Sequence, residues 1–379
     1  MAGISGGPRG RHPLPDPPDT HRGVQLGESG FVDRLDSSRD GGVTGSLGER
    51  IGAGAYATRL WSFQTARWLP NVPLYQDVML YLGDDAGFIY AVDAATGHGR
   101  RSISTADRIT GTPSVVDHVL FAPNNDFVSL DSDRGTLLVQ VQSDRQQVSV
   151  LAVVNGMVIA AGLRIPTGFV QAIDPVTAVE QWRIDLPGMV IGPPQLAGDR
   201  RVVATAAGEI LAIATATGQV AWRASVPGAM QSPSTVGEEA VFLTSSQGAD
   251  GFVTALDRAT GTERWQSPWA GRALLSPVLV AQRLVAASDA IVSVFDAQTG
   301  RAIRNQDGPD AITALGTGQN DAVLVGDSSG SLAALSSTEG TVQWRWHSSQ
   351  FLLIAGLSIT GEAIYVVSGS QLVAIAPPR

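Results

Sequence analysis

The sequence predicts an all-β fold in which eight similar four-stranded units follow one another along the chain. Three observations support this prediction. A short phrase, clearest as GFVTALDRATGTERW at 251–265, recurs at a spacing of roughly 40 residues. Each interval contains short apolar runs separated by polar turns, which is typical of short antiparallel strands. No window of comparable length shows the 3.6-residue apolar stripe of an amphipathic helix.

Six copies of the phrase are close to one another, and two, which begin at 126 and 370, are weaker. Aligned on the small residue that precedes the Asp, the anchor positions are Ala91, Ser129, Ala172, Ala212, Ala255, Val294, Ala334 and Ala374. A repeat array of this period builds one supersecondary unit per copy. Each copy is therefore expected to form one structural unit.

Four strands are predicted within each copy. The first two follow a proline and are divided by a short polar turn, as in PSVVDHVLFAP at 113–123 and PPQLAGDRRVVATA at 193–206. The third strand carries the anchor, and the fourth carries a Trp in several copies. Four short antiparallel strands per period favour a propeller blade over a helical solenoid, so we expect an eight-bladed β-propeller.

The turn between the third and fourth strands has a recognisable chemistry. In 257–261, Asp257 can accept backbone N–H groups, and Gly261 can take the positive φ that closes the hairpin. The small anchor residues let the neighbouring sheet approach closely. The Trp residues of the fourth strand share one slot, and we interpret them as wedges between blades rather than catalytic groups: Trp182, Trp222, Trp265 and Trp344.

The last copy ends at LVAIAPPR without a fourth strand. RLWSFQTA at 59–66 resembles that missing piece, so we expect the region around Trp61 to supply the outer strand of the eighth blade. This closure would remove the free edges of an open sheet stack. The predicted organisation is a disordered, Gly- and Pro-rich N-terminal segment at 1–56 and a propeller at 57–379.

Composition excludes several functions. The formal net charge of −9 argues against a nucleic-acid-binding surface. Because the chain has no Cys, disulfides, thiolate metal sites and a cysteine nucleophile are excluded. No apolar run has the length of a membrane span, and the N-terminus lacks the pattern of a secretion signal. We expect a monomer.

The composite A-x-D-x-x-T-G-x-x-x-W, complete at Ala255–Trp265, resembles the tryptophan-docking repeat of pyrrolo-quinoline quinone (PQQ) propellers. Ala212–Trp222 carries it with the Asp replaced, and Ala172–Trp182 has Ala178 in place of the Gly. The resemblance covers roughly 57–379 and implies an eight-bladed ring. The family contains PQQ- and calcium-dependent dehydrogenases of alcohols or sugars. It also contains non-enzymatic propellers, such as the lipoprotein of outer-membrane assembly and actinobacterial PQQ-like repeat proteins.

The resemblance favours the non-enzymatic branch. Its alcohol dehydrogenases cover the quinone with a ring formed by two adjacent cysteines and carry long inserts between blades, and this chain has neither. We therefore expect no catalytic residues, no cofactor and no metal, with PQQ and calcium as the alternative. Relatives that work outside the cytoplasm imply an extracytoplasmic place, although the assembly lipoprotein's acylated Cys is missing here.

The candidate binding surface is one rim of the central channel. The segments before each inner strand should reach this rim, where we expect a protein or peptide partner to bind. The candidate residues are Met189, Met230, Arg272, Leu274, Asp310 and Phe351. Met and aromatic side chains on loops suit adaptable recognition. Arg272 and Asp310 could contact a ligand or each other. Two alternatives remain open: that these residues plug the channel as core, and that the channel senses a small ligand.

Metal chemistry has little support in the sequence. Five His residues show no ligand-like spacing. Asp126, Asp131 and Asp133 gather oxygen ligands that could hold calcium. Asp131, however, occupies the hairpin slot that Asp93 and Asp257 fill in other copies, so we interpret it as a turn residue.

Overall fold

The structure is a computed structural model. It describes residues 55–378 except 106, 117, 124–126, 133, 135, 142–145, 155, 165–166, 175–176, 178, 249, 271, 273–274, 289–290, 308–310, 349–351 and 362. All described residues belong to one compact unit, Arg50–Arg379. The predicted N-terminal segment lies outside the described residues except for Ala55–Tyr56, which form a short strand.

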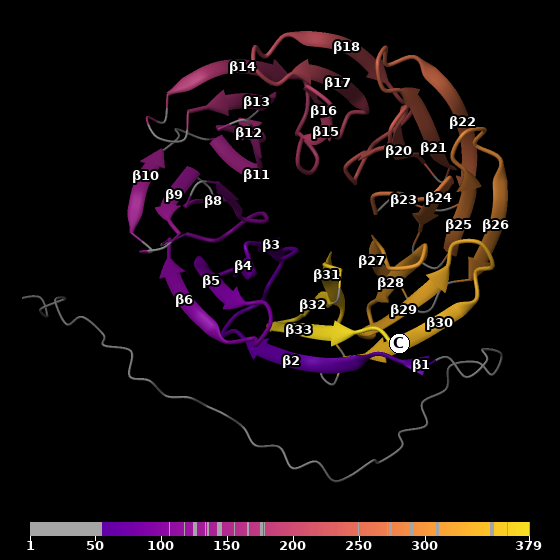
Figure 1. The fold of residues 1–379 in the computed structure, drawn as a ribbon. Helices are drawn as coiled ribbons and strands as arrows, with labels where there is room; N and C mark the ends of the chain where they lie inside the picture. The colour runs from indigo at the N-terminus through magenta and orange to yellow at the C-terminus, as the bar shows by residue number, and fades with distance from the viewer. Residues whose placement is uncertain are drawn as a thin grey trace, which may run out of the picture. The chain divides into compact units, whose positions relative to one another are not determined.

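Eight antiparallel four-stranded sheets, the blades, stand around a common centre, as Figure 1 shows. Blades 1 to 4 contain, from the innermost strand outward, β3 (Leu74–Gln76), β4 (Met79–Gly83), β5 (Phe88–Asp93) and β6 (Gly99–Ser104); β7 (Ser114–Val116), β8 (Val119–Pro123), β9 (Phe127–Asp131) and β10 (Leu137–Val141); β11 (Gln146–Val154), β12 (Met157–Arg164), β13 (Thr167–Ile173) and β14 (Glu180–Leu186); β15 (Gln195–Ala197), β16 (Arg200–Ala204), β17 (Glu209–Ala214) and β18 (Val220–Ser225).

Blades 5 to 8 continue in the same order. They contain β19 (Thr235–Val236), β20 (Ala240–Gln247), β21 (Asp250–Asp257) and β22 (Glu263–Ala270); β23 (Val278–Val280), β24 (Arg283–Ala287), β25 (Ile291–Asp296) and β26 (Ala302–Asp307); β27 (Ile312–Thr317), β28 (Ala322–Asp327), β29 (Ser331–Ser336) and β30 (Val342–His347); β31 (Ile354–Ile359), β32 (Ile364–Ser368), β33 (Gln371–Ala376) and β2 (Thr58–Gln64). The predicted eight-bladed β-propeller is confirmed.

The ring closes at blade 8 as the sequence predicts. Strand β2 pairs antiparallel with β33, and Trp61 lies opposite the anchor Ala374. One pairing was not predicted: β1 (Ala55–Tyr56) runs parallel to β30 and makes blade 7 five-stranded. The N-terminal part of the propeller therefore touches both of the last two blades.

Apolar packing between neighbouring blades forms the core. On β21 the side chains alternate in direction, yet Val253, Thr254 and Leu256 are all buried. The cluster that contains Val170 of blade 3 also contains Val203 and Ile213 of blade 4, so the two sheets pack face to face. Because both faces of a blade are covered, its third strand shows no plain alternation of apolar and polar residues.

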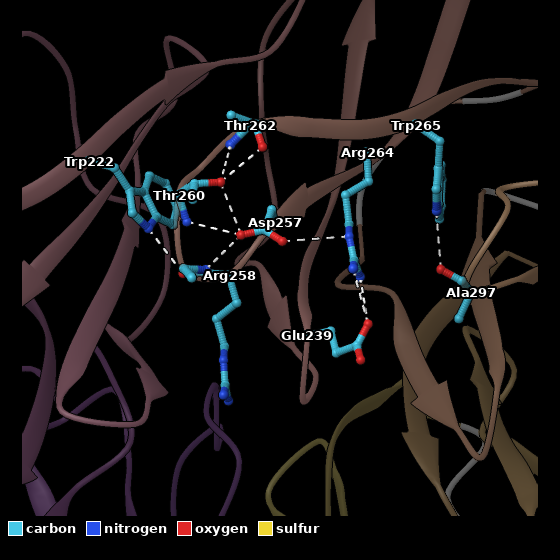
Figure 2. Close-up of polar contacts among 10 residues, drawn as sticks. Trp222, Glu239, Asp257, Arg258, Thr260, Thr262, Arg264, Trp265 and Ala297 are labelled. Carbon is cyan, nitrogen blue, oxygen red and sulfur yellow. Dashed lines mark hydrogen bonds and ion pairs between the residues drawn. The ribbon is translucent and has the colours of Figure 1, made fainter.

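The recurring Asp–Gly turn of one blade binds the Trp of the blade before it. The indole Nε1 atoms of Trp182, Trp222 and Trp265 donate to main-chain carbonyl oxygens in the following blade, at 3.1, 3.0 and 3.1 Å. Figure 2 shows the last two of these contacts. Trp61 makes the same bond to Ala94 at 3.1 Å and so joins blade 8 to blade 1. The interpretation of these residues as structural wedges is consistent with this geometry.

Trp344 occupies the slot differently. Strand β33 of blade 8 ends at Ala376, and among the residues that the structure describes no hairpin turn follows it for Trp344 to contact. Its side chain packs in a cluster that includes Ala57 and Ile375, and its backbone pairs with β1. The parallel strand β1 thus lies along the outer edge of blade 7, beside Trp344.

Candidate binding rim

Alternating strand directions place one set of connections at a single face of the ring. Each outer strand leads to the inner strand of the next blade through a loop, and these loops share a face with the hairpins between the second and third strands. The described loops include 65–73, 187–194, 226–234 and 348–353, apart from 349–351. We call this face the rim.

The six predicted rim residues differ in their exposure to solvent. Met189 is 44% exposed on the loop at 187–194. Met230 is buried in a cluster with Val241 and Leu243, so for this residue the core alternative applies. Arg272 is exposed. Leu274, Asp310 and Phe351 lie outside the described residues. The predicted surface, taken as a set, stays a prediction.

Four further apolar side chains on the rim are exposed, each between 36 and 39%: Trp68, Val72, Phe88 and Leu352. We call these four residues the seam patch, because all four lie at blades 8 and 1. Trp68 and Val72 are on the loop that joins these blades, Phe88 is on blade 1, and Leu352 packs against Gly369 of blade 8. Three of them, Trp68, Val72 and Leu352, lie on loops between blades, where the sequence predicts a binding surface. The loop at 65–73 was missed because it precedes the first complete copy of the repeat.

Hydrogen bonds fix the loop that carries Trp68. The main-chain N–H of Leu69 donates to Gly369 of blade 8 at 2.9 Å, and the Trp68 carbonyl accepts from Asp85 of blade 1 at 3.1 Å. Thr65 Oγ1 also donates to the Ser370 carbonyl at 2.8 Å. The loop is therefore held from both sides of the junction.

Two further seam-patch residues, Leu352 and Val72, each pack against a glycine. Leu352 covers Gly369, where a Cβ atom would collide with its side chain. Val72 packs against Gly356 of β31, where a Cβ would lie 2.9 Å from Val72 Cγ2. Both side chains rest on backbone and are still more than a third exposed. Two of the four seam-patch side chains are therefore held in place by packing against backbone while they remain exposed.

Polar groups near the seam patch bond within the protein. Asp84 is buried, and its carboxylate accepts from the N–H groups of Ala86 and Phe88 and from the Tyr90 hydroxyl at 2.9 Å. Burial, with the contribution of Asp84, raises the pKa of Tyr90 well above its ordinary value. This pair closes the hairpin that presents Phe88. Elsewhere on the rim, Arg223 bonds Glu209 at 2.5 Å.

No metal-binding group was found among the described residues: no three His, Asp or Glu side chains come together there. Asp131 accepts from the Arg134 N–H at 2.7 Å, in agreement with its interpretation as a turn residue. Asp126 and Asp133 lie outside the described residues. In the same part of the chain, no helix is long and apolar enough to cross a membrane.

The fold and the docking turns define a PQQ-like β-propeller. The profile of the family described as outer membrane protein assembly factor BamB matches residues 128–287 and 288–377, and the chain belongs to this family. No curated protein matches the chain.

Solved structures share the fold. BamB from Moraxella catarrhalis has a TM-score of 0.73 at 17% identity, covering 86% of this chain and 99% of that one. The computationally designed Ika8 protein has a TM-score of 0.69 at 16% identity, covering 83% and 98%. A europium-containing methanol dehydrogenase has a TM-score of 0.68 at 12% identity, covering 85% and 93%. At these identities the likeness shows the fold alone.

Proposed function

We propose that this propeller is a non-catalytic, monomeric scaffold that binds a protein or peptide partner through its rim. The observation that carries the proposal is the seam patch, where four large apolar side chains are exposed at one junction. Exposed apolar groups gathered on one surface mark interaction sites in soluble proteins. The family's name refers to protein assembly, which supports a protein partner. We propose a place outside the cytoplasm on the same ground.

The chemistry of the seam patch suits a protein contact. Trp68 offers a large rigid ring of the kind enriched at the centre of interfaces. Leu352 and Val72 add exposed aliphatic area, and because both already pack against backbone glycines, little further ordering is needed on binding. Met189, which is exposed on the same rim, adds an adaptable side chain.

The test is a binding comparison with matched variants. The full chain, the double variant Trp68→Ser/Leu352→Ser and the control Ile303→Ser are each used to capture partners by cross-linking in the native host. Ile303 is 40% exposed on the outer strand β26, away from the rim, so it matches the exposure of the patch. We expect one protein to be captured by the full chain and by the control, and lost with the double variant. Equal capture by all three would contradict a rim site.

A PQQ-dependent oxidoreductase of alcohols or sugars is the alternative, suggested by the fold shared with a methanol dehydrogenase. The purified chain is mixed with PQQ and calcium, and dye-coupled oxidation of alcohols and sugars is followed. We expect no turnover. Stoichiometric quinone binding with turnover would overturn the non-catalytic assignment.

A further inference from the structure

Arg201 is a buried cation with most of its donors unused. Its residue is 8% exposed, and Nη1 donates to the Pro194 carbonyl at 3.3 Å. Within the described residues, Nε has no hydrogen-bond partner. A guanidinium carries five N–H donors, so one long bond satisfies little of its capacity. Burial also lowers the pKa of Arg201 from its ordinary value, which shows the cost of desolvating this charge.

The Arg201 guanidinium bonds the residue that directly precedes the innermost strand of blade 4. The Arg201 side chain extends from β16, directly opposite Leu196 on the innermost strand β15. Figure 1 shows β15 at the inner side of blade 4. Side chains of directly opposed residues share one face of a sheet. Because Leu196 is 56% exposed, this face of the inner strand is open to solvent beside the buried guanidinium.

The same face is turned toward blade 3. Ile213 lies opposite Arg201 on β17, and it packs with Ile159 and Val170 of blade 3. The two inner strands of blade 3 and their turn, 146–164, contain no Asp or Glu in the sequence. The neighbouring blade therefore supplies no carboxylate from these strands.

Blade 4 itself supplies none either. Asp199 has a side chain that is 91% exposed, and it lies 3.9 Å from Arg200 rather than beside Arg201. Glu209 bonds Arg223 at the rim. Among the described residues, Arg201 therefore has no carboxylate partner. A buried charge in this state is costly, so an anion that completed the site would gain both charge pairing and hydrogen bonds.

We propose that Arg201 binds the carboxylate of a short aliphatic acid that enters along the inner face of β15. The carboxylate accepts from the free guanidinium donors, and the aliphatic part contacts Leu196. Arg201 donates a hydrogen bond to Pro194, which is the last residue of the rim loop at 187–194. A ligand bound to Arg201 would therefore lie next to the end of the loop that presents Met189. This site is independent of the seam patch and does not depend on the proposed scaffold function.

The test measures thermal unfolding of the full chain in sodium butyrate, in the neutral butyramide at equal concentration, and in sodium chloride at equal ionic strength. Arg201→Met removes the charge and keeps the apolar stem. Arg200→Met is the matched control, because Arg200 is adjacent on the same strand and faces the other way. At a butyrate concentration about tenfold above Kd, we expect the melting temperature of the wild type and of the control to rise by about 2 °C or more. Arg201→Met should show no butyrate-specific rise.

A second variant keeps the proposal falsifiable if Arg201→Met does not fold. Arg201→Lys retains the charge but cannot bind a carboxylate with two parallel N–H groups, so calorimetry should show a Kd about tenfold weaker. The proposal is overturned if butyrate and chloride act alike on the wild type, or if both Arg201 variants keep the wild-type response.

Discussion

The indole ring of Trp222 lies directly against the α-carbon of Gly261 in the following blade. A Cβ atom on Gly261 would be 2.5 Å from Cε3 of the ring. The same turn also receives the indole N–H, at the carbonyl of Arg258. Equivalent ring-to-glycine contacts occur at Trp61–Gly97, Trp182–Gly218 and Trp265–Gly300. The turn glycine therefore makes room for the Trp of the preceding blade as well as closing its own hairpin.

Gly261→Ala should destabilise the protein by about 2–4 kcal/mol. The positive φ of 74° costs about 1–2 kcal/mol for a residue with a Cβ, and displacing the Trp222 ring adds the loss of packing. Gly198→Ala is the control, because Gly198 has a φ of 70° and open space around its α-carbon. Chemical denaturation of both variants measures the difference. Equal losses would show that the ring contact contributes nothing.

Val78→Gly should stabilise the protein by about 1 kcal/mol. Val78 has a φ of +61° in the tight hairpin between β3 and β4, a conformation that is strained for a β-branched side chain. Its side chain is 66% exposed, so little packing is lost. The measurement is the free energy of unfolding in denaturant. A loss of stability would mean that the exposed Val side chain makes contacts that outweigh its backbone strain.

Stability should fall on the acid side because of the turn carboxylates. Hydrogen bonds from Arg100 and then Thr96 lower the pKa of Asp93 to about 2, and bonds from Thr260 lower the pKa of Asp257. A carboxyl group with an unfolded-state pKa near 3.9 and a lower folded-state pKa stabilises the fold above that value. This contribution is lost as the pH falls from about 5 toward 2.

The measurement is the melting temperature of the wild type and of Asp257→Asn between pH 7 and pH 3. Asn keeps an acceptor for the turn N–H groups but does not titrate. We expect the variant to melt lower than the wild type at pH 7 and the two curves to converge toward pH 3. A constant gap across this range would contradict the assignment.

Much of the fold could be predicted from the sequence, because each blade repeats its own local rules. The turn Asp, the turn Gly and the Trp slot are short-range patterns, and Trp61 could be matched to a slot that the last copy leaves empty. The rim could not be predicted in the same way. Met230 is buried and Met189 is exposed, although they lie on equivalent loops. The direction of a loop side chain depends on the local path of the backbone, whereas in a strand it alternates with a period of two residues.

The seam patch escaped prediction for a further reason. Trp68 and Leu352 come from opposite ends of the propeller sequence. They are brought to the same place only when the ring is closed, because Leu69 N–H bonds the Gly369 carbonyl and Leu352 packs on Gly369. The parallel pairing of Ala55 with Trp344 is equally a consequence of closure. The residues around Ala55 and those around Trp344 carry no local sequence pattern that predicts this pairing.

Closure of the ring by β2 is the claim on which the seam patch depends, and one cross-link tests it directly. Gln64 lies opposite Gln371 on β33, and the bond from Thr65 N–H to the Ser370 carbonyl marks this as a pair whose side chains approach closely. In this cysteine-free chain, Gln64→Cys/Gln371→Cys should form an intramolecular disulfide on mild oxidation, seen as a linked peptide by mass spectrometry. Gln64→Cys/Gln343→Cys, with its second site on β30 of blade 7, should form none. Absence of the first link, or equal formation of both, would contradict a ring closed by β2.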